Sequence, residues 1–277
     1  MLNLMYITNN PDIAKIAEDS GVDRIFVDME FIGKDARQGG LDTVQNHHTI
    51  DDIRRVKSVL SKSEVLVRIN PIHNQLEGYF DSKEEIDAAI EAGADILMLP
   101  FFHSVGEVKK FIDYVNGRVQ TCLLLETPEA AILIDEILNV PGIDMIHIGL
   151  NDLHLAMDMK FMFQLLTNGM VDLLASKIKA RGIPFGFGGI ANLHGGTLPG
   201  SYVLKEHYRL GSSMVILGRS FCNTNVITDK GEIKNIFDSG IAEIRELESE
   251  IQKVIEYFDV NHKCVVEAVT KIVEEKN

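Results

Sequence analysis

Residues 82–100, SKEEIDAAIEAGADILMLP, contain a predicted helix, a turn and a predicted strand in direct succession. The segment opens with Ser82, and a glutamate follows three residues later, a pattern typical of a capped helix N-terminus. Gly93 is the residue type that most often ends a helix. The apolar run that follows is uninterrupted, as in parallel strands that are buried on both faces. This helix–glycine–strand unit indicates an α/β fold.

The same unit recurs along the whole chain. Predicted helices begin at Pro11, at Ser104 and at Thr127, each with a residue that favours a helix start. Apolar, β-branched runs that predict strands cover residues 2–8, 24–30, 64–70, 95–100, 120–126, 144–149, 183–188 and 213–218. Eight strands that alternate with helices predict a (β/α)8 TIM barrel, with an open doubly wound sheet as the alternative.

Two parts of the chain depart from this rhythm. Residues 31–49 form a predicted loop longer than the usual connection between a strand and a helix. After the barrel, residues 229–277 form a predicted helical tail, so we expect a catalytic barrel domain at 1–228. Apolar residues in the tail recur at steps of three or four and form one stripe. We expect this stripe to pack on the barrel or on a neighbouring subunit, and we expect a homo-oligomer.

Composition excludes several classes of protein. Of the 277 residues, 45% are hydrophobic and 25% are charged, which is the balance of a globular protein. The formal net charge of −14 repels phosphate backbones, so we expect no nucleic-acid partner. No apolar run is long enough for a membrane span, and the N-terminus does not resemble a signal peptide. The three cysteines are scattered, and we therefore expect reduced thiols and a cytoplasmic location.

Charged residues stand where several predicted strands end. In a barrel, catalytic groups lie at the carboxyl ends of the strands, and adjacent strands bring their ends together. Glu126 and Asp152 follow the fifth and sixth predicted strands, so both carboxylates should meet at one rim. Two close carboxylates repel unless a cation lies between them, and carboxylate oxygens suit Mg²⁺ or Mn²⁺. The alternative is that Asp152 caps a helix while Glu126 forms an ion pair.

Arg68 lies within the otherwise apolar run VLVRIN at 65–70. A buried guanidinium needs a partner, because an unpaired buried charge is strongly destabilising. It could point into the barrel mouth and hold an oxyanion. It could also bridge to Asp28 or Glu30 on the neighbouring strand, and the two roles are compatible.

Together these segments resemble the HpcH/HpaI family, which contains metal-dependent 4-hydroxy-2-oxo-acid aldolases and citrate lyase beta-subunits. The resemblance extends from the first strand to about residue 222. Its most specific part pairs Glu-Thr on the fifth strand with Gly-x-x-Asp-Leu after the sixth. The matching stretches are RIFVDMEF (24–31), VLVRIN (65–70), LLLETPEA (123–130) and IDMIHIGLNDLHLAM (143–157).

The resemblance implies that Glu126 and Asp152 are ligands of a divalent ion, Mg²⁺ or Mn²⁺. It implies that Arg68 contacts the oxygen that becomes the enolate. Backbone N–H groups of Leu150, Asn151 and Asp152 would receive the carboxylate of the 2-oxo acid. The implied activity is carbon–carbon lyase activity, the cleavage of a 4-hydroxy-2-oxo acid to pyruvate or a related 2-oxo acid plus an aldehyde.

One position departs from the family pattern. Members with aldolase activity usually carry histidine after Asp-x-Glu, and this chain has Phe31 there. Phenylalanine cannot transfer a proton. We expect His48 to act as the acid or base instead, with His47, His103 or a metal-bound water as alternatives.

Two other functions remain open at this point. One is a lyase for a malyl- or citramalyl-type acyl-CoA, which the acidic composition disfavours because CoA carries phosphates. The other is a non-catalytic barrel that binds a 2-oxo acid, which the missing histidine would explain. The glycine-rich stretch GFGGIANLHGG at 186–196 could admit a phosphate to backbone amides, or it could simply allow close packing.

Overall fold

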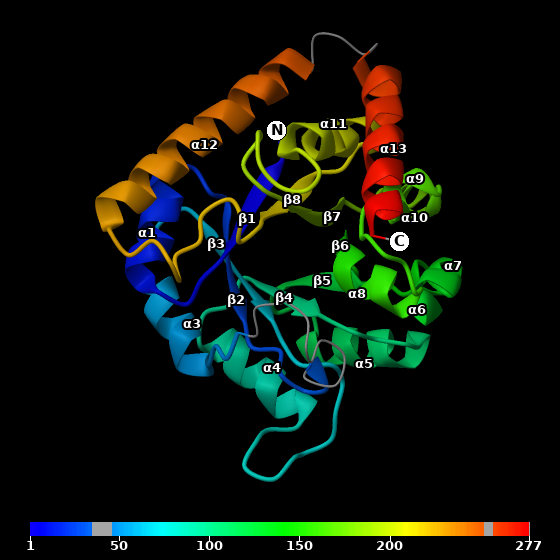
Figure 1. Ribbon diagram of the computed structural model, residues 1–277. Coiled ribbons are helices and arrows are strands. Elements are labelled where there is room, and N and C mark those ends of the chain that lie inside the picture. Colours follow the sequence, from blue (N-terminus) through cyan, green and yellow to red (C-terminus); the bar gives the residue numbers. More distant parts are fainter. Residues whose placement is uncertain (35–45, 252–256, 277) are drawn as a thin grey trace.

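The computed structural model describes residues 1–34, 46–251 and 257–276. Eight parallel strands close into a barrel in sequence order, each paired with its neighbours, and β1 also pairs with β8 (Figure 1). The prediction of a barrel is confirmed, and the open sheet is excluded. The strands are β1 (Asn3–Ile7), β2 (Arg24–Asp28), β3 (Glu64–Arg68), β4 (Ile96–Leu99), β5 (Gln120–Leu125), β6 (Met145–Ile148), β7 (Phe185–Ile190) and β8 (Met214–Leu217).

Helices surround this barrel and connect its strands (Figure 1). They are α1 (Pro11–Asp19), α3 (Ile50–Lys57), α4 (Ser82–Glu91), α5 (Val105–Val115), α6 (Pro128–Ile132), α7 (Ile134–Ile137), α8 (Leu150–Ala156), α9 (Gln164–Thr167), α10 (Met170–Ala180), α11 (Gly200–Leu210), α12 (Lys230–Ile251) and α13 (Tyr257–Glu275). No helix in these described ranges is both long enough and apolar enough to cross a bilayer.

Most predicted boundaries hold to within two residues, and two details are corrected. Helix α4 is capped by Asp81, not Ser82: the Asp81 carboxylate accepts the N–H of Glu84, and the Glu84 carboxylate accepts the N–H of Asp81. Strand β7 begins at Phe185 because Pro184 has no N–H to donate to the ladder.

The barrel has two apolar layers. Its interior is filled by a small cluster of strand residues, and the larger core lies between the strands and the surrounding helices. The interior cluster consists of Met5, Phe26, Leu66, Ile96, Met98, Cys122, Leu124, Met145 and Met214. These side chains close the barrel below the carboxyl ends of the strands, so polar groups gather above them.

The C-terminal helices pack on the chain's own barrel. Helix α12 lies along α1, and α13 lies against α11 and α9 (Figure 1). The predicted stripe includes Ile241, Ile244 and Val254: Ile241 and Ile244 lie on α12 and are buried, whereas Val254 lies outside the described residues. The alternative of packing on the barrel is therefore observed. The domain boundary at 228 and a homo-oligomer stay predictions.

Candidate active site

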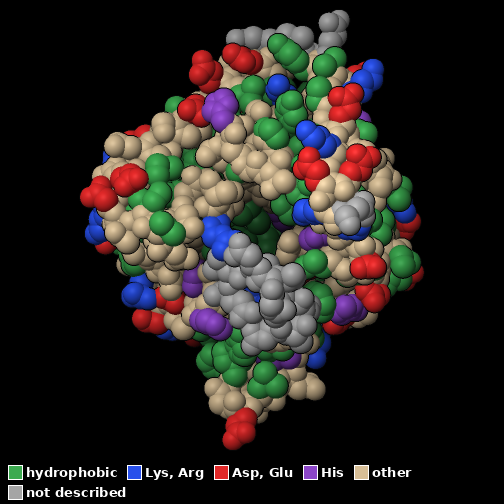
Figure 2. Space-filling model, viewed as in Figure 1, with side chains coloured by type: hydrophobic (Ala, Val, Ile, Leu, Met, Phe, Trp, Pro, Cys, Tyr) green, Lys and Arg blue, Asp and Glu red, His purple; other side chains and the backbone are tan. Residues whose placement is uncertain are grey.

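A cavity of about 340 Å³ lies at the carboxyl ends of the strands. Figure 2 shows a hollow at the centre of this face. Its wall combines apolar side chains from the barrel interior with several charged groups, as in sites that orient a small ligand. The polar side chains that line it are Lys34, Asn46, Arg68, Glu126, His147, Asn151, Asp152 and Arg219. This composition makes it the candidate active site.

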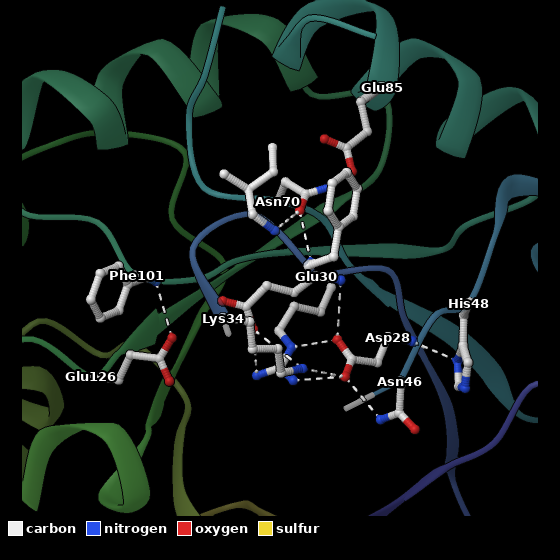
Figure 3. Close-up of polar contacts among 12 residues, drawn as sticks. Asp28, Glu30, Lys34, Asn46, His48, Asn70, Glu85, Phe101 and Glu126 are labelled. Atoms are coloured by element: carbon white, nitrogen blue, oxygen red, sulfur yellow. Dashed lines mark hydrogen bonds and ion pairs between the residues drawn. The ribbon is translucent and has the colours of Figure 1, made fainter. Parts of the chain in front are cut away.

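Glu126 and Asp152 both line this cavity, as the sequence predicts. Glu126 follows β5 directly and is 3% exposed, and Asp152 lies in the first turn of α8 and is 7% exposed. The backbone N–H of Phe101 donates to Glu126 Oε1 at 3.0 Å (Figure 3). Phe101 itself has a left-handed φ of 46°, an unusual conformation for a large residue. A strained loop after β4 thus orients the Glu126 carboxylate.

Gly149 makes room for Glu126. A Cβ at position 149 would lie 2.7 Å from the Glu126 Cβ and 2.8 Å from its Oε2. The side chain of Glu126 therefore rests against the backbone at the point where β6 leads into α8. This contact joins the two segments that carry the predicted metal ligands.

The two carboxylates supply the oxygen donors that a hard divalent ion prefers. Within the described ranges, no group of three or more His, Cys, Asp or Glu side chains could hold a metal ion. Mg²⁺, however, is commonly bound through one or two carboxylates, while water and substrate oxygens complete its shell. Two buried carboxylates on the wall of one cavity match that requirement. The role of Glu126 and Asp152 as metal ligands stays a prediction.

Arg68 forms ion pairs with both Asp28 and Glu30, the two partners that the sequence offers as alternatives. Its Nε and Nη2 donate to the two oxygens of Asp28 at 2.7 and 2.8 Å, and Nη1 lies 3.3 Å from Glu30 Oε2. The guanidinium also stacks over the ring of Phe26, 5.6 Å from its centroid. Since Arg68 lines the cavity as well, the ionic contacts fix its orientation toward a ligand.

The charge on Asp28 is maintained by these contacts. Burial alone would raise the pKa of Asp28, but the positive charge and hydrogen bonds of Arg68 outweigh burial and hold it below its ordinary value. Lys34 and Asn46 act in the same direction. Reciprocally, burial would lower the pKa of Arg68, and the charges of Asp28 and Glu30 raise it above its usual range. Both groups therefore remain ionised at neutral pH.

Lys34 belongs to the same cluster and was not predicted from the sequence. Its Nζ lies 3.0 Å from Asp28 Oδ2 and 3.7 Å from Glu30 Oε2 (Figure 3). The side chain is buried, and it lines the cavity. Asp28 Oδ2 also accepts from Asn46 at 2.9 Å. The two acids provide the partners that a buried lysine needs, because lysine is almost never buried unpaired.

The turn that follows β2 brings Lys34 back to the strand end. Asn70 Oδ1 accepts the N–H groups of Phe31 and Ile32 at 2.9 and 3.0 Å, and Gly33 reverses the chain with a φ of 73°. Asn70 is in turn held by Glu85 Oε1, which accepts from its Nδ2 at 2.9 Å. Most of the predicted long loop lies outside the described residues, but its first turn is thus fixed from β3.

The predicted histidines lie around this cavity and not in its wall. His48 Nδ1 accepts the backbone N–H of Asp28 at 2.9 Å, and its ring lines a neighbouring cavity between the ends of β1 and β8. Burial lowers the pKa of His48, with Asp28 opposing the shift. His47 is exposed, and His103 pairs with Glu129 at 3.3 Å on the surface. A catalytic role for His48 stays a prediction.

His147 on β6 does line the cavity, but its ring is held in place. Its Nε2 lies 2.9 Å from the carbonyl oxygen of Gly188, so this nitrogen carries the proton and donates it. Nδ1 is fully buried, and a Cβ at Gly186 would lie 2.8 Å from it. Burial lowers the pKa of His147 to about 4, despite the hydrogen bond to Gly188. The ring is therefore neutral at physiological pH.

The predicted carboxylate-binding residues lie beside the acids. Leu150, Asn151 and Asp152 form the first turn of α8 and line the cavity. Gly188 and Gly189 of the glycine-rich stretch line it from β7, where Gly188 has a φ of 49° and approaches Leu150. Close packing therefore accounts for at least one of these glycines. Binding of a carboxylate or a phosphate here stays a prediction.

Comparisons with known proteins give a match to one family model. The family model described as HpcH/HpaI aldolase/citrate lyase matches residues 3–165. No curated protein sequence matches the chain.

Solved structures with the same fold include an HpcH/HpaI aldolase from Desulfitobacterium hafniense DCB-2 (16% identity, 88% of this chain and 93% of that chain, TM-score 0.59). An HpcH/HpaI aldolase/citrate lyase family protein from Burkholderia cenocepacia J2315 is similar as well (14%, 84% and 94%, 0.60). A third is the citrate synthase SbnG (15%, 89% and 94%, 0.57). At these identities the likeness to solved structures supports the fold alone.

Proposed function

Since the chain belongs to the HpcH/HpaI aldolase/citrate lyase family, we propose that it is a divalent-metal-dependent carbon–carbon lyase. Its substrate would be a 4-hydroxy-2-oxo acid, cleaved to pyruvate or a related 2-oxo acid and an aldehyde. One observation carries the proposal: Glu126, Asp152 and Arg68 line a single cavity at the carboxyl ends of the strands. Family membership by itself supports lyase activity and leaves the particular reaction open.

The side chains have distinct tasks in this proposal. Glu126 and Asp152 would hold Mg²⁺ or Mn²⁺, which when bound supplies Lewis acidity toward the keto oxygen. Arg68 keeps its charge beside Asp28 and would stabilise negative charge that develops on the substrate oxygen. The backbone of Leu150, Asn151 and Asp152 would orient the carboxylate. Because these groups are positioned by strands and buried contacts, they need little rearrangement during the reaction.

The cavity also bears on the two alternatives. Its walls contain three cations and two acids among the described polar side chains, a mixture that suits a small anionic ligand together with a metal ion. An acyl-CoA would need further contacts for its phosphates. A non-catalytic 2-oxo-acid-binding barrel would keep metal and ligand binding without proton exchange, so proton exchange separates it from the enzyme.

The test is exchange of the pyruvate C3 protons with D₂O, followed by NMR in the presence and absence of Mg²⁺ or Mn²⁺. The wild-type protein should exchange these protons only with metal, and Glu126→Gln should abolish the exchange. Glu129→Gln is the matched control, because Glu129 lies three residues further along the chain and is exposed. Metal-dependent exchange that persists in Glu126→Gln would contradict the proposal.

A further inference from the structure

The end of β2 is held by the short segment that precedes α3. Asp28 is fully buried, and its side chain and backbone are both bonded to residues 46–48. Asn46 Nδ2 donates to Asp28 Oδ2 at 2.9 Å, and the backbone N–H of His48 donates to the Asp28 carbonyl oxygen at 3.3 Å. In the opposite direction, the Asp28 N–H donates to His48 Nδ1 at 2.9 Å (Figure 3). His48 therefore contacts both backbone groups of Asp28.

The imidazole is needed there because β1 ends before β2 does. The register of the two strands ends where Ile7 lies beside Phe26, two residues before Asp28. On its other side, β2 is accompanied to its end by β3, where Asp28 lies beside Arg68. A buried N–H without an acceptor is costly to the fold. His48 Nδ1 thus supplies the acceptor that β1 no longer provides.

Helix α3 determines where the His48 ring lies. His48 immediately precedes Thr49, the N-cap of α3, whose hydroxyl accepts the N–H of Asp52 at 3.3 Å. The Asp52 carboxylate in turn accepts the N–H of Thr49 at 2.7 Å. These reciprocal bonds form a capping box and fix the backbone next to His48. The position of the ring is therefore set by the start of a helix.

The bond from Asp28 also occupies the one lone pair of the neutral His48 ring. Because Nδ1 accepts a hydrogen bond, the ring proton lies on Nε2. A proton taken up at Nδ1 would face the Asp28 N–H, so two donors would meet without an acceptor. A neutral imidazole does not release its remaining proton near neutral pH. Burial favours the same neutral state, since it lowers the pKa of His48. These properties disfavour proton transfer by His48.

Asp28 connects this contact to the candidate active site. Its carboxylate accepts from Arg68 Nε and Nη2 at 2.7 and 2.8 Å, and Arg68 lines the cavity whereas His48 does not. The direction of the guanidinium therefore depends on where the backbone of Asp28 holds the carboxylate. A displacement of about 1 Å at a reacting group can cost about 10²-fold in rate. An acceptor at position 48 can thus affect the reaction without touching the substrate.

We propose that His48 is a positioning residue of the lyase: its imidazole is a neutral acceptor that fixes the end of β2 and, through Asp28, orients Arg68; this inference rests on the proposed function. The role differs from that of the acid or base that the sequence suggests for His48. It requires only an acceptor atom at the place of Nδ1. Asparagine can supply one, because its Oδ1 lies as many bonds from Cα as the Nδ1 of histidine.

The experiment compares His48→Asn with His48→Leu, both loaded with Mn²⁺, in the exchange of the pyruvate C3 protons. His48→Asn keeps the acceptor but cannot take up a proton, and we expect nearly the wild-type rate. His48→Leu fills the space without an acceptor, and we expect a loss of about 10²-fold. Loss of a true acid or base would instead lower both rates by about 10²–10⁴-fold.

Controls separate this effect from unfolding and from loss of the metal. Urea denaturation shows whether His48→Leu is folded under the assay conditions. Its Mn²⁺ affinity should change little, because Glu126 and Asp152 are held by other elements. His194→Asn, at a site where the side chain is 86% exposed, should exchange pyruvate protons at the wild-type rate.

The state of the ring is measurable without any activity. In ¹⁵N NMR spectra of the histidine rings, the His48 signals are identified by their absence in His48→Asn. We expect Nε2 to carry the proton at neutral pH and Nδ1 to carry none. A ring with its proton on Nδ1 would contradict the proposed role, whatever the protein catalyses.

Two results of the exchange experiment would also overturn the inference. One is a His48→Asn variant that loses as much activity as His48→Leu, and the other is wild-type exchange in both variants. Either result leaves the lyase function standing if the wild-type protein exchanges protons with metal. Absence of metal-dependent exchange in the wild-type protein would instead remove the proposed function, and the role of His48 in it.

Discussion

At the scale of single residues, the position of the Glu126 side chain depends on its uncharged neighbours Gly149 and Phe101. The Glu126 carboxylate has its place because position 149 has no side chain and because Phe101 directs an N–H toward it. Neither feature involves a charged residue, yet both determine where the charge lies. The direction of Glu126 is therefore a property of the β4 and β6 loops as much as of β5.

Replacement of Gly149 tests this directly. In Gly149→Ala, the new Cβ would lie within 2.8 Å of two Glu126 atoms, so the carboxylate must move. Overpacking of this kind typically costs about 1–3 kcal/mol in stability, and we expect metal-dependent C3 exchange to fall at least about tenfold as Glu126 is displaced. The measurement is the NMR exchange rate together with a urea denaturation curve.

Gly106→Ala is the matched control. A Cβ at this position would have Ser104 Oγ as its nearest neighbour, at 3.8 Å, and alanine suits a helix better than glycine. That variant should be unchanged in activity and at least as stable. If Gly149→Ala exchanged pyruvate protons at the wild-type rate, the packing of Glu126 against the β6 turn would have no functional role.

Residue-scale inference from the sequence was most successful at strand ends. The positions of Glu126, Asp152 and Arg68 at the cavity could be predicted because an apolar run that turns polar marks the rim of a barrel, and their roles stay predictions. Lys34 could not, since it lies in a loop and reaches the cavity only through Asn70 and Gly33. The turn that carries it is held by Asn70, which lies just after β3 in the chain, and local spacing does not reveal this contact.

At the scale of elements, β6 and β7 are joined across the cavity floor by His147 and Gly188. The folded chain keeps His147 neutral down to a pH of about 4, whereas in the unfolded chain it takes up a proton near its ordinary pKa of 6.5. Between these values the unfolded state binds more protons. The contribution of the neutral His147 to the free energy of unfolding should therefore be complete above pH 6.5. It should decrease as the pH falls toward 4.

The size of this effect is measurable. The His147 contribution lost between pH 7 and pH 5 is about 2 kcal/mol, from 1.36 kcal/mol per pKa unit. Urea denaturation at the two pH values should show a smaller loss in His147→Gln than in the wild-type protein. His103→Gln, at an exposed site, should retain the wild-type difference. An equal decrease in the free energy of unfolding in all three proteins would mean that burial does not protect His147 from protonation.

Element boundaries followed from capping chemistry where the caps were unambiguous. Ser104 and Thr127 cap their helices as predicted, and each accepts an N–H from the third residue of its helix. The start of α4 was wrong by one residue, because Asp81 and Ser82 are both good caps and only the fold selects between them. Adjacent capping residues leave such a choice open in any sequence.

At the scale of the whole molecule, the barrel was predictable because the same unit repeats. Eight apolar runs separated by helices allow few closed arrangements, and errors of one or two residues do not alter the strand order. The tail was predictable only as an apolar stripe. Its packing on α1 and α11 depends on surfaces formed by residues far away in the chain, so the sequence left the barrel and a neighbouring subunit as alternatives.

We propose above that Glu126 and Asp152 together bind one divalent ion beside Arg68. A crystal soaked with Mn²⁺ and pyruvate tests it most directly through the anomalous signal of manganese. We predict one strong peak in the cavity, with an oxygen of each carboxylate at about 2.0–2.4 Å and pyruvate oxygens completing the shell. A peak bound by other side chains, or a cavity that takes up pyruvate without manganese, would contradict the claim.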